Sequence, residues 1–177
     1  ARNVQDGWLS LEKVDYISHE THKKLQQRLA VSPGDVLLSC SGTVGRSCVA
    51  PADVEFSLVR SAAVLKPVFH MGQYMSYALR SLTLQGQINE KKSQTAQANI
   101  FQGKIKTLVF PLPPIAEQKE LLDQVENSFL IISHVEKDLD GQLIRAERCR
   151  QAILTSQFSG CGGSELLWRF DDDSRKN

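Results

Sequence analysis

A polar run between residues 91 and 99 carries side chain types suited to hydrogen bonding with nucleic-acid bases. Amides can bond bidentately to adenine, Arg and Lys to guanine, and Ser or Thr to either. Lysines alone would supply only attraction to phosphate, so a run that mixes them with amides and hydroxyls could attract a duplex and also read it. The candidate contact residues of this run are Lys91, Lys92, Ser93, Gln94, Thr95, Gln97 and Asn99. Taken alone, the same composition is more typical of a solvated loop.

Two other segments raise similar questions. A weaker candidate of the same kind holds basic and amide side chains, namely Lys23, Lys24, Gln26, Gln27 and Arg28. The run from Gly42 to Ser47 superficially suggests a phosphate loop, but it lacks the G-x-x-x-x-G-K-[ST] spacing. The simpler interpretation is a tight turn in which Gly42 and Gly45 adopt positive φ.

Sequence patterns of catalysis and metal binding are missing from the chain. It contains no G-x-S-x-G, H-E-x-x-H or G-x-G-x-x-G, and no Asn/Asp-Pro-Pro-Tyr/Phe signature of a base-methylating enzyme. We therefore expect that the chain is not itself an enzyme. The cysteines have no C-x-x-C spacing, which indicates free thiols rather than a zinc site or a disulfide framework; they are Cys40, Cys48, Cys149 and Cys161.

The N-terminus lacks the apolar core of a signal peptide, and no apolar run approaches the roughly 18 residues of a membrane span. These features predict a cytoplasmic protein without a membrane partner. Charge is unevenly distributed along the chain. Residues 1–113 carry 13 Lys and Arg against 8 Asp and Glu, a balance of +5. Residues 114–160 carry 5 against 8, a balance of −3, so the basic part is compatible with a polyanionic partner.

The part before residue 113 predicts a small domain of mixed strands and helices. A polar helix from His19 to about Gln27 is capped by Ser18. We expect strands over residues 35–40, 47–49, 58–65 and 104–112, and helical spacing over residues 72–84.

A long helix is predicted from Pro114 to about Gly160. Proline is tolerated at the first helical position, and Glu117 and Glu120 follow where the helix dipole favours negative charge. Apolar residues then recur at alternating steps of three and four: Leu122, Val125, Phe129, Ile132, Leu139, Leu143, Ala146 and Ile153. A helix of about 45 residues is roughly 65–70 Å long, so its apolar face needs a partner helix, and a coiled coil is the expected form.

Taken together in their order and spacing, several blocks resemble the DNA-specificity subunits of type I restriction-modification systems. The blocks typical of the C-terminal region are Leu112-Pro113-Pro114-x-x-Glu117-Gln118, the long helix, Gln151-Ala152-Ile153-Leu154 and Phe158-Ser159-Gly160. Those that look like that family's target recognition domain are Pro33-Gly34-Asp35-Val36-Leu37-Leu38, Gly42-Thr43-Val44-Gly45-Arg46 and Ser57-Leu58-Val59-Arg60. The resemblance covers about residues 1–160.

The resemblance implies an α+β fold, with a small mixed α/β target recognition domain followed by a long C-terminal coiled-coil helix. We expect the recognition domain at 1–113 with its N-terminal part absent, the spacer and dimerisation helix at 114–160, and a flexible tail at 161–177. In this family the glycine turn lies on the nucleic-acid side, which adds Thr43 and Arg46 to the expected contacts. It also favours DNA contact over a solvated loop for residues 91–99.

The implied function is to bind one half of a bipartite double-stranded DNA target and to dock the methylation and restriction subunits. Those partners would carry the S-adenosylmethionine and ATP chemistry, with no cofactor in this chain. Residues 114–140 hold 7 acidic and 2 basic side chains, and 141–160 hold 3 basic and 1 acidic, which favours an antiparallel homodimer. Two alternatives stay open: a recognition and linker fragment of a single-chain restriction or modification enzyme, and a non-specific coiled-coil scaffold.

Overall fold

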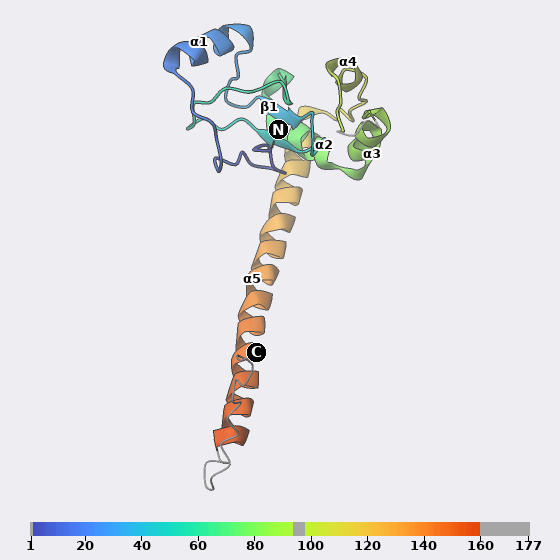
Figure 1. The fold of residues 1–177 in the computed structure, drawn as a ribbon. Helices are drawn as coiled ribbons and strands as arrows, with labels where there is room; N and C mark the ends of the chain where they lie inside the picture. The colour runs from blue at the N-terminus through green and yellow to red at the C-terminus, as the bar shows by residue number, and fades with distance from the viewer. Residues whose placement is uncertain (1, 94–97, 160–177) are drawn as a thin grey trace, which may run out of the picture. The chain divides into compact units, whose positions relative to one another are not determined.

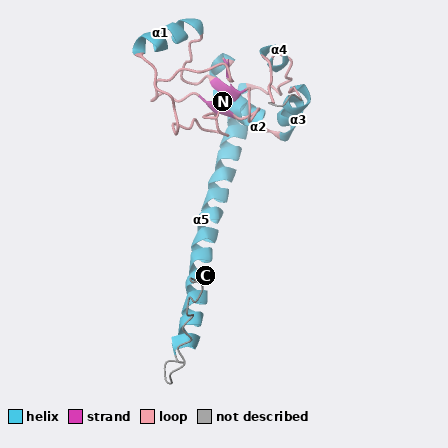
Figure 2. Cartoon of the chain, viewed as in Figure 1, coloured by secondary structure: helices cyan, strands magenta, loops and turns pink. Residues whose placement is uncertain are grey.

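The computed structural model describes residues 2–93 and 98–159. It combines a small sheet with helices, which confirms the α+β class expected from the sequence (Figure 2). The chain divides into two compact units, Ala1–Asp123 and Gln124–Asn177. We call the first unit the head, and residues 124–159 the distal helix. The predicted tail lies outside the described residues.

The sheet of the head has three strands, β1 (Val36–Ser39), β2 (Ser47–Val49) and β3 (Ala62–Leu65), in the order β2-β1-β3. Both pairings are antiparallel, with Leu37 opposite Cys48 on one side and Val64 on the other. All four residues of β1 are buried, because the central strand is covered on both faces. A strand buried on both faces is expected to read as a continuous apolar run, and Val-Leu-Leu does so. These strands confirm the predictions at 35–40 and 47–49, and β3 is a shortened form of the one at 58–65.

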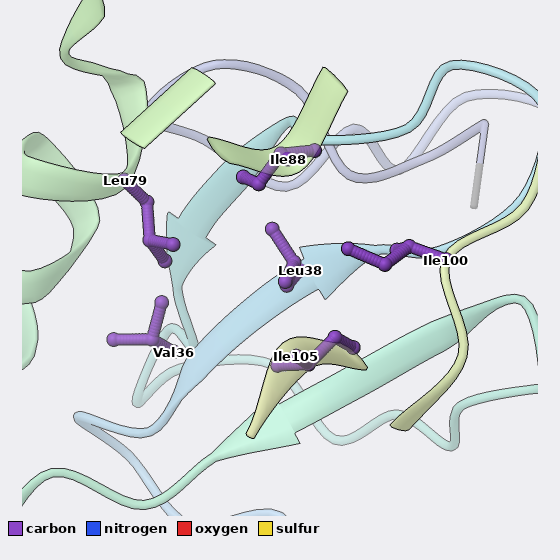
Figure 3. Packing of buried hydrophobic residues seen from close by; sticks show 6 residues of the cluster. All are labelled: Val36, Leu38, Leu79, Ile88, Ile100 and Ile105. Atoms are coloured by element: carbon purple, nitrogen blue, oxygen red, sulfur yellow. The ribbon is translucent and has the colours of Figure 1, made fainter. Parts of the chain in front are cut away.

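One face of the sheet is covered by helices. Alternate side chains of β1, Val36 and Leu38, point to this face and meet Leu79, Ile88, Ile100 and Ile105 (Figure 3). Leu79 belongs to α2 (Gly72–Arg80), Ile88 to α3 (Leu82–Lys91) and Ile105 to α4 (Gln102–Ile105). These contacts hold α2, α3 and α4 on this face of the sheet.

The opposite face is covered by loops rather than by helices. Leu37 and Cys48 pack there with Val4, Ala50 and Ala62, and half-buried Val31, Phe56 and Leu58 close the cluster. Helix α1 spans His19–Arg28. Its N-cap is Ser18, as predicted, and the Ser18 side chain accepts a hydrogen bond from the Thr21 amide.

The helical spacing over residues 72–84 corresponds to two helices. Ser81 ends α2 with extended backbone and its side chain caps α3 by accepting from the Leu84 amide at 3.4 Å. Helix α3 then continues to Lys91, so the first residue of the polar candidate run is helical. The apolar residues Leu84 and Ile88 are buried and hold α3 against the sheet.

The strand predicted over residues 104–112 is wrong. Its first residues belong to α4, and the remainder has no regular structure. Side chains supply the hydrogen bonds that a neighbouring strand would have made. The Gln87 amide donates to the Val109 carbonyl at 3.0 Å and accepts from the Val109 amide at 2.8 Å, and the Tyr74 hydroxyl donates to the Pro111 carbonyl at 3.0 Å.

Helix α5 (Ile115–Ser159) has 45 residues and begins directly after Pro113 and Pro114, as the sequence predicts (Figure 1). Gln118 is buried near its start, and its side chain donates to the Pro113 carbonyl at 2.6 Å. In the distal helix Val125 is half-buried, and the later apolar residues are exposed, including Phe129, Ile132, Leu139, Leu143 and Ile153.

Candidate nucleic-acid interface

The glycine turn between β1 and β2 is a rigid structure built around Ser39. Gly42 has φ of 75° and Gly45 has φ of 99°, which confirms the expected left-handed conformations at both positions. The Ser39 hydroxyl donates to the Thr43 carbonyl and accepts from the Arg46 amide at 3.0 Å. The turn is therefore held from within, and the Thr43 residue is left exposed.

The turn is joined by its backbone to the second candidate segment. The Gly42 amide donates to the Ala98 carbonyl at 3.1 Å, and the Ile100 amide donates to the Cys40 carbonyl at 2.9 Å. Ser41 and Asn99 form an isolated antiparallel bridge, and so do Ser93 and Asn99. Two stretches about 50 residues apart in sequence thus form one surface. We call residues 41–46, 91–93 and 98–99 the candidate readout surface; residues 94–97 lie outside the described residues.

The described members of the 91–99 run are half-buried rather than free in solvent. Lys91 is the last residue of α3, and the Lys92 amide donates to the Ile88 carbonyl at 2.9 Å to close that helix. The Lys92 ammonium donates to the Asn89 side chain at 2.8 Å. Both lysines are therefore positioned by α3, which is itself anchored in the core. Gln94, Thr95 and Gln97 are predicted contacts whose placement is outside the described residues.

Arg46 is engaged by the N-terminal segment. Its guanidinium donates to the Gln5 side-chain oxygen at 2.6 Å, and its Nε lies 4.0 Å from an Asp6 carboxylate oxygen. The structure thus places Arg46 at the edge of the turn with an acidic neighbour. Gln5 takes one of the five N–H donors of the guanidinium, and the remaining donors can serve a base edge.

Two features of this surface were missed by sequence reasoning. Gln85 donates to the Gly45 carbonyl at 2.9 Å and to the Leu79 carbonyl at 2.7 Å, and so locks the turn onto α3. A Cβ on Gly45 would lie 2.8 Å from the Gln85 side-chain oxygen, so this contact requires glycine. Lys104 and Lys106 are exposed on and just after α4, beside Phe101, which is 67% exposed. Because a strand was predicted over residues 104–112, neither lysine was predicted to contact DNA.

The described cysteines form neither a disulfide nor part of a metal site. Cys40, Cys48 and Cys149 are free, as expected. Burial raises the pKa of the Cys48 thiol to about 11 and raises that of Cys40, so both stay protonated near neutral pH. Across residues 2–93 and 98–159, no group of three or more His, Cys, Asp or Glu could hold a metal ion. In the same ranges, no helix combines the length and hydropathy needed to cross a bilayer.

Comparison with known proteins identifies the family of the chain. Residues 8–139 match the model of the type I restriction modification DNA specificity domain, which is more than half of the chain. The chain therefore belongs to this family, and the resemblance inferred from the sequence blocks is confirmed.

Two specificity subunits illustrate the relationship. The type I restriction enzyme EcoBI specificity subunit of Escherichia coli is 26% identical over 160 residues, which are 89% of this chain and 34% of the relative. The StySPI specificity subunit of Salmonella potsdam is 36% identical over 72 residues, 41% of this chain and 16% of the relative. The chain spans about a third of the length of the first relative.

A solved structure of a type I R-M system, described in terms of complex assembly and conformational transition, contains a similar chain. The two share 27% identity with a TM-score of 0.50, over 67% of this chain and 30% of that chain.

Proposed function

We propose that the chain binds double-stranded DNA sequence-specifically as the reading part of a type I specificity subunit, and that it reads one half of a bipartite target. The observation that carries this proposal is the backbone pairing of the Gly42 turn with residues 98–100. It joins the two polar segments that the sequence singles out.

Charge supports the same surface. Residues 1–113 hold a balance of +5, whereas residues 114–160 hold −3. Phosphate therefore attracts residues 1–113 and repels α5. Lys91 and Lys92 belong to the candidate readout surface, and Lys104 and Lys106 are exposed on and just after α4.

The contact residues fall into two roles. Lys91 and Lys92 contact phosphate, which positions the duplex without reading it. The amide and hydroxyl side chains read base edges in the major groove, together with the guanidinium of Arg46. The reading residues of the proposal are Thr43, Arg46, Ser93, Gln94, Thr95, Gln97 and Asn99.

The experiment starts from a duplex selected from a random pool with the partner subunits present. Affinity of each variant is then measured on the selected and on random duplexes at several salt concentrations. Lys91→Ala or Lys92→Ala should weaken both duplexes alike and lower the salt slope by about 0.9. Gln94→Ala or Gln97→Ala should cost roughly 1–3 kcal/mol on the selected site and much less on random DNA.

Arg46 offers a sharper variant because its present partner is known. Gln5→Ala removes the competing acceptor and leaves the guanidinium in place. If Arg46 reads a base, Arg46→Ala lowers the ratio of selected to random affinity, while Gln5→Ala leaves that ratio at or above the wild-type value. A ratio that stays constant for every substitution in both segments would place the reading surface elsewhere.

A second part of the proposed function is assembly with other subunits. We propose that the chain docks the methylation and restriction subunits on the bound DNA, and that S-adenosylmethionine and ATP act on those partners rather than on this chain. The purified chain should then transfer no methyl group to DNA and cut none. Methyl transfer from S-adenosylmethionine by the chain free of partner subunits would instead favour the alternative of a fragment of a single-chain enzyme.

A non-specific coiled-coil scaffold is the second candidate, because the distal helix exposes its apolar residues. The two proposals differ in competition. Random duplex at equal concentration should displace a scaffold from the selected site as well as unlabelled selected duplex does. A specific reader should resist random duplex.

A further inference from the structure

Helix α1 buries none of its residues, and polar contacts tie it to the loop between β2 and β3. The two ring nitrogens of His22 lie 2.8 Å from the Ser57 hydroxyl (Nδ1) and 2.9 Å from the Glu55 carboxylate (Nε2). The Gln26 amide donates to the Phe56 carbonyl at 3.3 Å. A ten-residue helix is marginal in water by itself, so these contacts hold α1 in its observed place. We call His22, Glu55 and Ser57 the latch.

The latch has the order of a serine, histidine and carboxylate relay, which raises the question of catalysis. A nucleophile needs space for a substrate beside it. Two hollows border this region, one of about 450 Å³ lined by His22 and Glu55 among others and one of about 320 Å³ lined by Gln26 and Glu55 among others, and Ser57 lines neither. The latch is therefore better understood as an anchor for α1.

The side chains of α1 divide into two faces. His22 and Gln26 are one turn apart and half-buried against the loop. Lys23, Lys24, Gln27 and Arg28 are exposed on the remaining circumference. Lys24 pairs with Glu20 at 2.7 Å, but an exposed ion pair at this spacing on a helix contributes little to stability. The basic face is therefore available to a stronger anionic partner.

We propose that α1 is a second DNA-binding element, which grips the phosphate backbone outside the bases that are read and which the latch holds in position. This inference rests on the proposed function. The hollow of about 450 Å³ supports it, since its lining includes His19, Lys23 and Gln27, all able to donate to a phosphate oxygen. The proposal assigns a task to a helix that contributes no residue to the core.

The fold separates α1 from the candidate readout surface. The loop that holds α1 packs on the face of the sheet formed by Leu37 and Cys48, whereas α3 and α4 cover the face formed by Val36 and Leu38. Figure 1 shows α1 on one side of β1 and α3 with α4 on the other. Packed layers lie about 10 Å from a sheet, and α1 lies outside the loop layer, so the two elements are at least about 20 Å apart. That distance corresponds to at least about six base pairs. Helix α1 should thus touch flanking DNA.

The test uses the full chain and duplexes that carry the selected half-site with long or trimmed flanks. The double variant Lys23→Gln/Lys24→Gln should weaken selected and random long duplexes by the same factor and reduce the salt slope by about 0.9 for each lost contact. On a duplex trimmed to fewer than about six base pairs beyond the half-site on the α1 side, the variant should equal the wild type. The matched control is Lys119→Gln/Lys137→Gln on α5, which should change neither slope nor affinity.

The latch has a separate test. His22→Ala should lower the salt slope as the double lysine variant does, and combining the two should add nothing, because both remove the same contacts. A merely structural role for His22 would lower the unfolding midpoint and leave the slope unchanged. Thermal unfolding of each variant is measured alongside to separate the two.

Failure of this inference differs from failure of the proposed function. If the wild type prefers its selected site but the lysine variant keeps the wild-type slope on long duplexes, α1 does not contact DNA. The proposal is equally overturned if flank trimming fails to remove the effect of the variant. If the wild type shows no preference for any selected duplex, the proposed function itself is wrong.

Discussion

The core strand of the head and the distal helix differ in how far their apolar side chains are buried. In the head, β1 is covered on both faces, and Val36, Leu37 and Leu38 have no exposed surface. In the distal helix, Phe129, Ile132 and Leu139 remain about half exposed. Burial of a leucine-sized side chain contributes about 1.5–3 kcal/mol, so the head obtains this free energy within the chain and the distal helix does not.

This difference indicates that the apolar face of the distal helix needs a partner that the described residues do not supply. Exposed apolar residues repeated at steps of three and four form a seam that matches the seam of a coiled coil. The sequence predicts a seam made of Leu122, Val125, Phe129, Ile132, Leu139, Leu143, Ala146 and Ile153. Leu122 and Val125 are half-buried near the start of the helix, and Ala146 is exposed. Pairing of this seam with a second copy of the chain is a prediction. The following variants test the difference in burial between the core of the head and the distal helix.

The largest effect is expected in the core of the head. Leu38→Ala removes a side chain that contacts both α2 and α3 residues and should lower the free energy of unfolding by about 2–5 kcal/mol. Amide hydrogen exchange of β1 reports this region specifically. The matched variant Leu139→Ala, at an exposed position, should leave exchange in β1 unchanged. Equal losses of protection in both variants would show that the head depends on the helix seam.

The next effect concerns association through the distal helix. Ile132→Asp places a charge in the seam and should convert a dimer to a monomer in sedimentation equilibrium without altering β1 exchange, because an unpaired buried charge is costly. Ile131→Asp is the matched control, since Ile131 is exposed, neighbours Ile132 and lies outside the stepped series. If light scattering shows that the wild type is monomeric at high concentration, the homodimer prediction is wrong. The helix of another chain would then be the partner to seek.

Charge should set the direction of pairing, with a smaller effect. Replacing Arg145, Arg148 and Arg150 by Glu turns the basic half acidic, so an antiparallel dimer would place acid against acid. Each lost pair is worth about 0.2–1 kcal/mol, and high salt should restore association. Replacement of the same residues by Lys should change little. In a parallel dimer the basic halves already repel each other, so an unaffected dissociation constant in the Glu variant would support that orientation.

The two regions also differ in how much the sequence foretells. Helix α5 was predictable to within a residue or so, because Pro113 and Pro114 set its start and the apolar series marks its length. Strand β1 was predictable because Val36, Leu37 and Leu38 form an uninterrupted apolar run. The positive φ of Gly42 and Gly45 followed from the turn composition. In each case local chemistry alone decides the structure.

Structure that depends on distant partners was not predictable. The alternating residues 105–110 suggest a strand, but the Gln87 side chain takes the place of a neighbouring strand at Val109. Both candidate segments were found by residue type, yet their pairing through Gly42 and Ala98 depends on the sheet that positions them. Arg46 was a good candidate by type, and only the structure reveals that Gln5 already binds it.

A further prediction is a pH dependence of the stability of the head. Burial raises the pKa of Cys48 from 9.0 to about 11, whereas the unfolded thiol keeps its ordinary value. Between about pH 9 and 11 the unfolded chain therefore binds fewer protons than the folded head. Stability contributed by the protonated thiol is present below pH 9 and is lost as the pH rises toward 11. Burial of Cys40 acts in the same direction.

Cys48→Ala should lower stability at every pH because it leaves a small cavity, but the decline above pH 9 should be shallower than in the wild type. The slope of unfolding free energy against pH is therefore the useful measurement, not its value at one pH. Cys149→Ala, on the exposed surface of the distal helix, is the matched control and should keep the wild-type slope. A wild-type slope in Cys48→Ala would mean that the thiol becomes solvated before the head unfolds. The head would then open locally around β2, and the contrast between a closed head and an open helix would be weaker than the burial of β1 suggests.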